Sequence, residues 1–158
     1  MGRRGAQLAL AFGLVAAPGW AACQPDQVEL RWPAGSARFS VEIADDLEER
    51  AQGLMGRKTM ASSAGMLFVY EKPVQARFWM KNTLLPLDMV FADATGTVTA
   101  VHSNAIPLDE TSIDGGPSVQ YVLEINGGLA TRMGIAPGAE LRSPVVDQSR
   151  ARWRCAVG

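Results

Sequence analysis

The sequence LDMVFADATGTVTAVH, residues 87–102, decides the fold class. Residues 87–91 place leucine, methionine and phenylalanine on one side of an extended chain, because successive side chains of a strand point to opposite faces. The stretch 93–96 contains aspartate and glycine and predicts a turn, and residues 97–102 form a second extended run. The whole segment therefore predicts a β-hairpin.

Further short runs of extended character lie on both sides of this hairpin, and turn-forming residues separate them. They are residues 38–43, 78–81, 120–125 and 139–142. Helical spacing predicts one short helix over residues 47–54, capped by aspartate 45 or 46 and ended by glycine 53 or 56. A second helical turn is expected over residues 129–133, stopped by a glycine.

Many strands with little helix predict a mainly β fold, an antiparallel β-sandwich or jelly-roll-like arrangement with one or two short helices. The chain has 158 residues, of which 47% are apolar, so it is long enough for one domain and too apolar for a disordered chain. We expect this β domain over residues 38–142. A lead-in over residues 22–37 precedes it, and a C-terminal tail over residues 143–158 follows, in which residues 147–154 are charged and expected to be frayed.

The N-terminal segment has the pattern of a signal peptide over residues 1–21. Arg3 and Arg4 precede an apolar run over residues 8–17, and small residues stand at the two positions that a signal peptidase reads. The run is shorter than the roughly 20 residues that a spanning helix needs. The alternative is a buried N-terminal helix. We expect export, to the periplasm of a bacterium, and no transmembrane segment in the mature chain.

The two cysteines of the chain, Cys23 and Cys155, stand near the two ends of the mature protein. In an oxidising compartment an even number of cysteines favours a disulfide, and this one would tie both ends of the domain together. The alternative is a lipid anchor on Cys23, since residues 20–23 loosely resemble a lipoprotein cleavage box. A lipid on Cys23 would leave the other thiol unpaired, so we favour the disulfide.

Several separate motifs occur in a fixed order along the chain. They are ERAQGLMGR (49–57), GMLF (65–68), FWMKNT (78–83), PLDM (86–89), VLE (122–124) and GIAPGA (134–139). Together they resemble the family of the domain of unknown function 192 (DUF192), over roughly residues 39–141. One departure is Gly138-Ala139, where such proteins often carry Gly-Asp. The resemblance implies a compact, mainly β, jelly-roll-like domain, often exported in bacteria, and it implies no activity.

The most suggestive polar cluster is Trp79, Lys81 and Asn82. In a strand Trp79 and Lys81 share one face, and Asn82 follows at a turn, where polar side chains often meet ligands. We expect these three residues to form the floor of a shallow cleft, with Arg57 and Glu124 at its rim. The alternative is structural: the indole covers the sheet, the asparagine builds a turn, and Arg57 pairs with Glu124.

Acid–base chemistry has three candidate residues, Asp88, Glu124 and His102. Two carboxylates on one sheet face could pair as acid and base, with their separation deciding the outcome. A lone histidine at a strand end is more often a structural residue than a base. A hydrolase that uses Asp88 or Glu124 with His102 is therefore the alternative function.

The remaining composition argues against several other classes of function. One histidine and two cysteines are too few for a four-ligand zinc site, and the methionines fit core packing better than a copper site, so we expect no metal and no cofactor. A net charge of −1 does not favour nucleic-acid binding. The first-choice function is an exported, non-catalytic β-domain that binds a small molecule, a glycan or a protein partner. The oligomeric state stays open.

Overall fold

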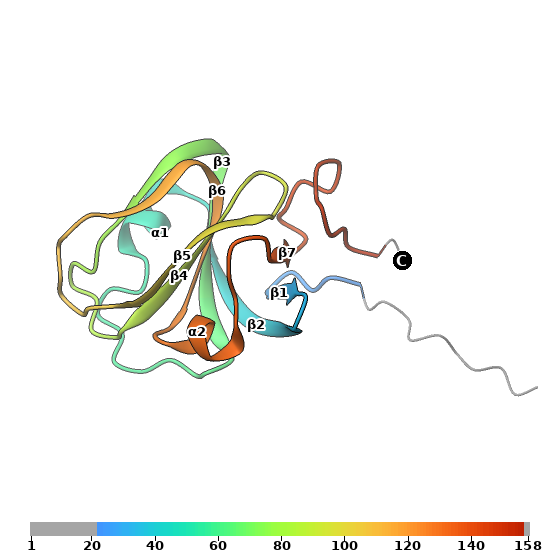
Figure 1. Cartoon of the computed structure of the whole chain (residues 1–158). Coiled ribbons are helices and arrows are strands. Elements are labelled where there is room, and N and C mark those ends of the chain that lie inside the picture. The colour runs from blue at the N-terminus through green and yellow to red at the C-terminus, as the bar shows by residue number, and fades with distance from the viewer. Residues whose placement is uncertain (1–21, 157–158) are drawn as a thin grey trace, which may run out of the picture.

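The computed structural model describes residues 22–156, so the expected signal peptide over residues 1–21 lies outside the described part of the chain. The described residues form seven strands and two short helices (Figure 1). In chain order these are β1 (Gln27–Trp32), β2 (Gly35–Ala44), α1 (Leu47–Gln52), β3 (Ala64–Phe78), β4 (Leu87–Ala92), β5 (Val98–Ala105), β6 (Ile113–Asn126), α2 (Leu129–Met133) and β7 (Glu140–Arg142).

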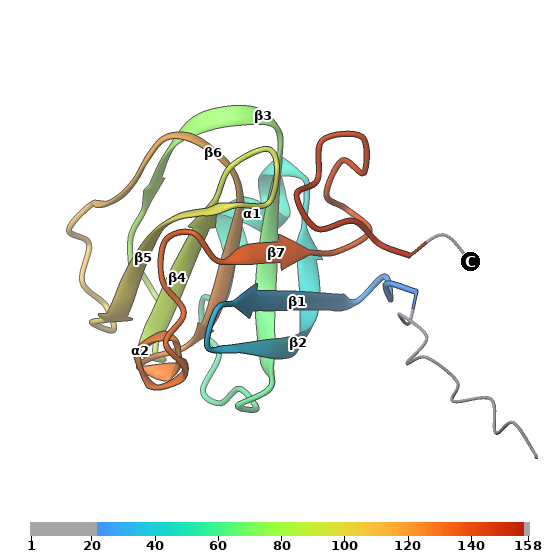
Figure 2. The ribbon, with the colours of Figure 1, turned by 45° about the vertical axis from the view of Figure 1, so that its right-hand side comes forward.

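The seven strands form one sheet in the order β5-β4-β6-β3-β2-β1-β7. All neighbouring pairs are antiparallel except β2 and β3, which are parallel. The sheet curls until its two edges approach each other, as the views in Figures 1 and 2 show. An isolated antiparallel bridge joins Thr97 to Glu140, and the Leu141 N–H donates to the Gly96 carbonyl at 2.7 Å. The result is a half-barrel whose edge strands meet at one point.

The mainly β, single-domain fold is confirmed, whereas the expected sandwich arrangement differs from the structure. One curled sheet replaces two facing sheets, and the β2–β3 pair is parallel rather than antiparallel. Parallel neighbours need a crossover connection, which α1 and the segment after it provide here. Alternation along a strand shows which face is buried but not which strands are neighbours, so the sequence pattern did not distinguish the two arrangements.

The predicted strand over residues 78–81 is the clearest local error. In the structure β3 runs through residues 64–78 and ends where the predicted strand begins. The chain then turns away from the sheet, with the Thr83 N–H donating to the Met80 carbonyl at 3.1 Å. The strand β1 is also absent from the sequence-based prediction, because it lies in the expected lead-in. The hairpin and the runs that became β2, β6 and β7 are confirmed.

Both short helices lie where the sequence placed them. The Asp46 carboxylate accepts the Glu49 N–H at 2.8 Å and caps α1, and Gly53 ends it with a positive φ of 48°. The second helix, α2, lies between Gly128 and Gly134, both in the left-handed region that favours glycine. The segment after α1 covers one face of the sheet, where Leu54 and Met60 pack in the apolar cluster.

Apolar side chains are buried on both faces of the curled sheet. The cluster on the concave side includes Leu30, Phe39, Val90, Tyr121, Leu123, Ile125 and Leu141. The cluster on the opposite side includes Met66, Phe68, Met80, Leu87, Met89, Phe91 and Val122, covered by Leu54 after α1 and by the 79–86 loop. All six residues of β4 and residues 119–125 of β6 are buried, so a polar side chain in these two stretches points into one of the two clusters.

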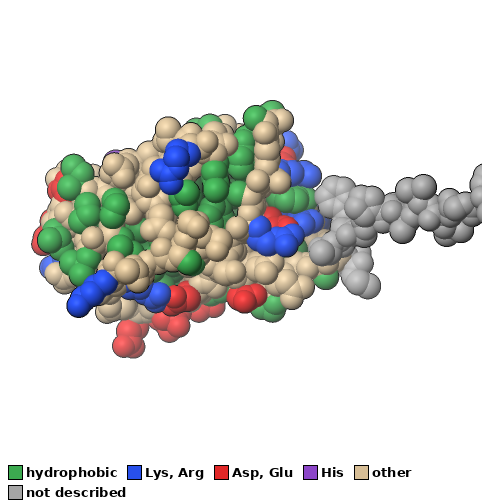
Figure 3. Space-filling model, turned by 90° about the horizontal axis from the view of Figure 1, so that it is seen from below, with side chains coloured by type: hydrophobic (Ala, Val, Ile, Leu, Met, Phe, Trp, Pro, Cys, Tyr) green, Lys and Arg blue, Asp and Glu red, His purple; other side chains and the backbone are tan. Residues whose placement is uncertain are grey.

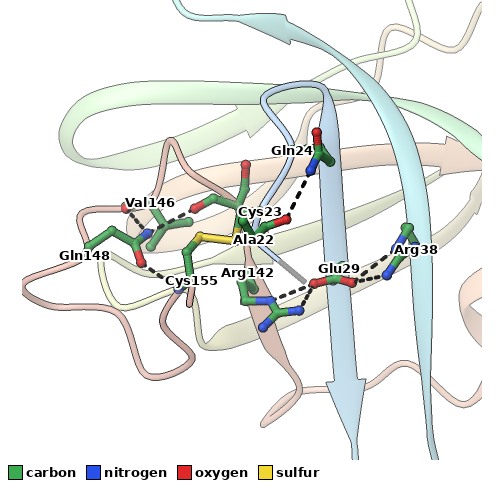
Figure 4. Close-up of a disulfide and its surroundings, with 10 residues drawn as sticks. Ala22, Cys23, Gln24, Glu29, Arg38, Arg142, Val146, Gln148 and Cys155 are labelled. Carbon is green, nitrogen blue, oxygen red and sulfur yellow. Dashed lines mark hydrogen bonds and ion pairs between the residues drawn. A yellow bond between two sulfur atoms is a disulfide. The ribbon is translucent and has the colours of Figure 1, made fainter. Parts of the chain in front are cut away.

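A disulfide joins Cys23 to Cys155 across a sequence separation of 132, as the cysteine count predicted (Figure 4). Beside it, Glu29 accepts hydrogen bonds from Arg38 at 2.7 Å and from Arg142. Burial raises the pKa of the Glu29 carboxyl, but the hydrogen bonds and charges of the two arginines outweigh it and lower that pKa overall.

The segment after β7 packs against the barrel and is not the frayed tail that its charge suggested. Val146 and Ala151 are buried, and the Trp153 ring lies 4.2 Å from the guanidinium carbon of Arg142. Between residues 22 and 156, neither helix is long and apolar enough to cross a membrane.

Candidate functional site

The candidate site is built around Glu124, which lies in the middle of β6. Its strand is hydrogen-bonded on one side to β3 and on the other to β4, and Glu124 lies opposite Met66 and Met89 in these two ladders. The position therefore faces the apolar cluster under α1. The residue is only 5% exposed, although its side chain carries a carboxyl group.

A cavity of about 90 Å³ lies beside this carboxyl group. Its lining comes from the end of α1, from β3 and β6, and from the loop that follows β3. The side chains that matter for its chemistry are Arg50, Tyr70, Arg77, Trp79, Thr83 and Glu124. The space is large enough for a few water molecules or for one small group of a ligand.

The carboxyl group of Glu124 has no partner in this environment. It makes no hydrogen bond or ion pair with any residue that the structure describes, and its pKa is raised by burial to about 8. A carboxylic acid with this pKa is mostly protonated at pH 7. At neutral pH the cavity therefore contains an O–H donor and carboxyl acceptors that no protein group uses.

The loop over residues 79–83 forms one wall of the cavity and is fixed by backbone hydrogen bonds. The Met80 N–H donates to the Asp109 carbonyl at 2.8 Å, and the Leu108 N–H donates to the Thr83 carbonyl at 3.1 Å. These bonds hold the loop against the next loop of the chain. The position of the indole beside the carboxyl is thus set by two loops that meet at one end of the barrel.

The same end of the molecule carries exposed apolar side chains. Trp79 is 47% exposed, and Leu84, Ile106 and Leu108 on the two adjoining loops are exposed as well. Figure 3 shows hydrophobic side chains gathered at the left end of the molecule, the end that carries these loops in Figure 1. The mouth of the cavity therefore lies beside an apolar surface.

Two cations of the protein lie over the aromatic side chains of the site. The Lys81 ammonium is 4.9 Å from the centre of the Trp79 ring, and the guanidinium carbon of Arg50 is 5.1 Å from the centre of the Tyr70 ring. Arg50 also donates to the Val69 carbonyl at 2.9 Å. Burial raises the pKa of the Tyr70 hydroxyl, so this group is neutral at physiological pH.

The structure brings together some of the predicted site residues. Trp79 and Glu124 line the same cavity, and Lys81 lies against the indole. Asn82 is exposed with a positive φ of 53°, and its carbonyl accepts the Gly56 N–H at 2.9 Å. Asn82 therefore lies in a turn, and none of the hydrogen bonds of the described structure involves its side chain.

Arg57 does not line this cavity. Its guanidinium pairs with Glu42 at 2.5 Å and lines a neighbouring groove, which shares residues 51–53 with the cavity. The hydrogen bond from Arg57 is the main cause that lowers the pKa of Glu42, against a smaller opposing effect of burial. The predicted position of Arg57 at the rim beside Glu124 and the alternative Arg57–Glu124 pair are both absent from the described structure.

Asp88 is buried on the opposite face of the sheet. It lies opposite Ile125 in the β4–β6 ladder, one position from the pair formed by Met89 and Glu124, so the two carboxylates point to different faces. Its oxygens accept three backbone N–H bonds, from Asn104 at 2.6 Å, Gly128 at 2.7 Å and Ala130 at 2.6 Å. This carboxylate caps the start of α2 from a neighbouring strand.

His102 is exposed on β5 and lines a different cavity, together with Met80 and Ile113. The three candidate acid–base residues therefore lie in three separate environments. Among residues 22–156, no three His, Cys, Asp or Glu side chains are grouped as metal ligands.

Sequence reasoning missed Arg50, Tyr70 and Thr83. Tyr70 belongs to the part of β3 that was not predicted, and the sequence places Arg50 on the helix without indicating a partner. One signal for the site was present in the sequence: Glu124 interrupts an apolar run in a strand that is buried on both faces.

The comparison with known families agrees with this architecture. The DUF192 profile, described as "Uncharacterized ACR", matches residues 30–143. The chain belongs to the DUF192 family. The matched region contains every strand from β2 to β7 and all residues of the cavity.

Two solved structures share this DUF192 fold at substantial sequence identity. A protein of unknown function from Novosphingobium aromaticivorans is 40% identical with a TM-score of 0.71, covering 73% of this chain and 82% of its own. A Sinorhizobium meliloti protein, described as a "putative transcription regulator", is 42% identical with a TM-score of 0.72, covering 78% of this chain and 96% of its own. No curated protein matches the chain.

Proposed function

We propose that this DUF192 protein is an exported, non-catalytic binding domain that takes a small molecule, or one projecting group of a larger partner, into the cavity beside Glu124. The observation that carries the proposal is the Glu124 carboxyl: it is 5% exposed, lines a cavity and has no partner among the described residues.

Burying the carboxyl group of Glu124 away from water costs free energy. A carboxyl group without a hydrogen-bond partner destabilises a fold, and an apolar residue at this position would pack against the two facing methionines at no such cost. A buried acid that costs stability and lines a cavity is typical of a functional site. A ligand that hydrogen-bonds to Glu124 would offset the cost.

The geometry favours binding over hydrolysis. Glycosidase-like acid–base catalysis needs two carboxyl groups across one open cleft, and here Asp88 faces the other side of the sheet with its oxygens already engaged. His102 lines a different cavity from Glu124. Glu124 therefore has neither a second carboxylate nor a histidine beside it in its cavity.

Export is supported by the covalent chemistry of the chain. The Cys23–Cys155 disulfide suits an oxidising compartment, and residues 1–21 have the pattern of a signal peptide. The net charge of −1 gives no support for extending the transcription-regulator description of the Sinorhizobium meliloti relative to this chain.

The test of the binding proposal is a thermal-shift screen of small molecules on the wild type, Trp79→Ala and Leu84→Ala. A ligand raises the unfolding midpoint by mass action, and we expect at least one stabiliser of the wild type. Trp79→Ala should fold with nearly the wild-type midpoint and lose that shift. Leu84→Ala is the matched control, because Leu84 is similarly exposed on the same loop but does not line the cavity, and it should keep the shift.

Two outcomes would contradict the proposal. One is a stabiliser that shifts wild type and Trp79→Ala equally. The other is a Trp79→Ala protein that unfolds as core aromatic truncations do, at a cost of about 3–5 kcal/mol, because the indole would then be structural.

The test of export is the mass of the mature protein recovered from the periplasmic fraction. We expect cleavage after Ala21 and a mature protein that gains about 2 Da on reduction, from one internal disulfide. A diacylglycerol-sized addition on Cys23, or a free Cys155 thiol in the oxidised protein, would contradict this.

A further inference from the structure

We infer that the group taken into this cavity is a primary alkylammonium, which pairs with the ionised carboxylate of Glu124. The inference rests on the proposed function, and it adds the chemical class of the ligand.

The walls of the cavity favour a cation. Phe68, Tyr70, Phe78 and Trp79 all line it, and the face of an aromatic ring attracts positive charge. The Lys81 ammonium lies 4.9 Å from the centre of the Trp79 ring, so this indole already contacts one cation, although Lys81 itself does not line the cavity. A negatively charged ligand group would meet both the ring faces and the carboxyl group, and it would be repelled by an ionised Glu124.

Two groups of the lining, the Thr83 hydroxyl and an ionised Glu124, need donors, and the neutral Tyr70 hydroxyl can also accept. The Thr83 hydroxyl donates its proton to the Lys81 carbonyl at 3.1 Å, so its oxygen has only lone pairs left to offer. An ionised Glu124 also accepts only. A primary ammonium has three N–H donors and no acceptor, which matches a carboxylate and a hydroxyl oxygen. A cavity of about 90 Å³ admits such a group with one or two attached carbons.

The two arginines that line the cavity do not supply a positive partner for the Glu124 carboxylate. Arg50 donates to the backbone carbonyls of Asp45 and Val69 and lies over Tyr70. The Arg77 side chain is 62% exposed and lies 3.9 Å from Asp114. Neither arginine forms an ion pair with Glu124 in the described structure, so the carboxylate needs a cation from outside. A metal ion is not favoured, because only one carboxylate faces the cavity.

Pairing with an ammonium changes the protonation of Glu124. The free site holds a neutral carboxylic acid at pH 7, since burial raises its pKa to about 8. On binding, the carboxyl O–H proton leaves to solvent and the carboxylate accepts hydrogen bonds from the ligand N–H groups. The other titratable groups that face the cavity are Tyr70 and Arg77 on β3 and Arg50 on α1. Tyrosine and arginine side chains do not change charge between pH 6 and 8. Affinity for an amine must therefore rise with pH.

The experiment is a titration of the disulfide-bonded mature protein with ethylamine at pH 6, 7 and 8, at constant ionic strength, followed by amide and methyl NMR shifts of the cavity residues. Ethanol is the neutral probe of the same size, and acetate is the anionic one. A three-atom ligand binds in the millimolar range at best. We expect ethylamine affinity to rise by about tenfold from pH 6 to 7 and less steeply from pH 7 to 8. Acetate should not bind.

Two matched variants separate the carboxyl from general electrostatics. Glu124→Gln keeps the size of the side chain and should lose ethylamine binding at every pH. Glu42→Gln removes a carboxylate that is engaged with Arg57 outside the cavity, and it should bind like the wild type.

The outcomes distinguish this inference from the proposed function. Ethanol or acetate binding in the cavity more tightly than ethylamine, or ethylamine affinity that falls with pH, would overturn the ammonium assignment and leave a binding cavity. Absence of ethylamine binding overturns the assignment as well. If no stabiliser in the screen depends on Trp79, the proposed function fails too.

Discussion

Asp88 and Glu124 are both buried carboxyl groups on neighbouring strands, yet their surroundings are opposite. Asp88 lies on the concave face and accepts three backbone N–H bonds that order the start of α2. Glu124 lies one ladder position away on the other face, has no hydrogen-bond partner in the described structure, and lines a cavity.

The difference shows that the same chemical group can be fully used by the fold in one place and left without a protein partner in another. A carboxylate whose oxygens are all used by the backbone stabilises the fold and has nothing left for a ligand. A carboxyl that is buried and unused costs stability, and its hydrogen-bonding capacity is available to a molecule that enters the cavity. Single substitutions at the two positions should therefore change stability in opposite directions.

The largest effect is expected for Asp88→Ala. This change leaves one buried and two part-buried backbone N–H groups without an acceptor and removes the cap of α2, so the free energy of unfolding should fall by about 3–5 kcal/mol. Urea unfolding of wild type and variant at pH 7 measures the change. A decrease in the free energy of unfolding below about 1 kcal/mol, the contribution of one ordinary hydrogen bond, would show that the hydrogen bonds of Asp88 do not stabilise the fold.

Glu124→Gln should stabilise the protein at pH 7, by about 2–3 kcal/mol. The folded-state pKa of Glu124, about 8, lies above the value of 4.5 for the free side chain. Below pH 4.5 the carboxyl is protonated in both the folded and the unfolded state, and the free energy of unfolding is highest. As pH rises from 4.5 toward 8, only the unfolded state ionises, so the free energy of unfolding falls progressively. Urea unfolding at several pH values should show a fall between pH 5 and 8 that is weaker in the variant.

The control for this prediction is Glu42→Gln, which removes an ion-paired carboxylate and should not stabilise at pH 7. Equal stability of wild type and Glu124→Gln across pH 5–8 would mean that Glu124 has a partner in the folded protein.

The smallest effect is expected for Arg57→Ala. Its ion pair with Glu42 is largely solvent-accessible, with side-chain exposures of 37% for Arg57 and 55% for Glu42. Loss of this pair should therefore cost about 0–1 kcal/mol. Ligand binding in the cavity should be unchanged, because Arg57 does not line the cavity. A stabiliser that binds the wild type but not this variant would place Arg57 in the site after all.

Much of the local structure was readable from the sequence. The hairpin over residues 87–102 and the caps of α1 depend on alternation, turn residues and an aspartate before the helix, all of which act over a few residues. The parallel β2–β3 pair depends on which strands become neighbours, which alternation does not encode. The single curled sheet depends on the same pairing of strands that are distant in the sequence.

The candidate site was predicted in part for the same reason. Trp79 and Glu124 were placed together and share a cavity, although Trp79 reaches it from a loop rather than from a strand. Arg57 was misplaced, because its partner Glu42 is on a strand that the sequence does not set beside it. The opposite faces of Asp88 and Glu124 depend on a one-residue register between β4 and β6, which only the folded ladder shows.

The protonation of Glu124 is measured by titrating its carboxyl carbon with ¹³C NMR in the mature, ligand-free protein, with Glu124→Gln used for assignment. We expect a midpoint near pH 8, because burial without a partner raises the pKa of this carboxyl. A midpoint near 4.5, the value of a solvated glutamate, would show that the group is hydrated or paired, and it would contradict the unpartnered acid on which the binding site depends.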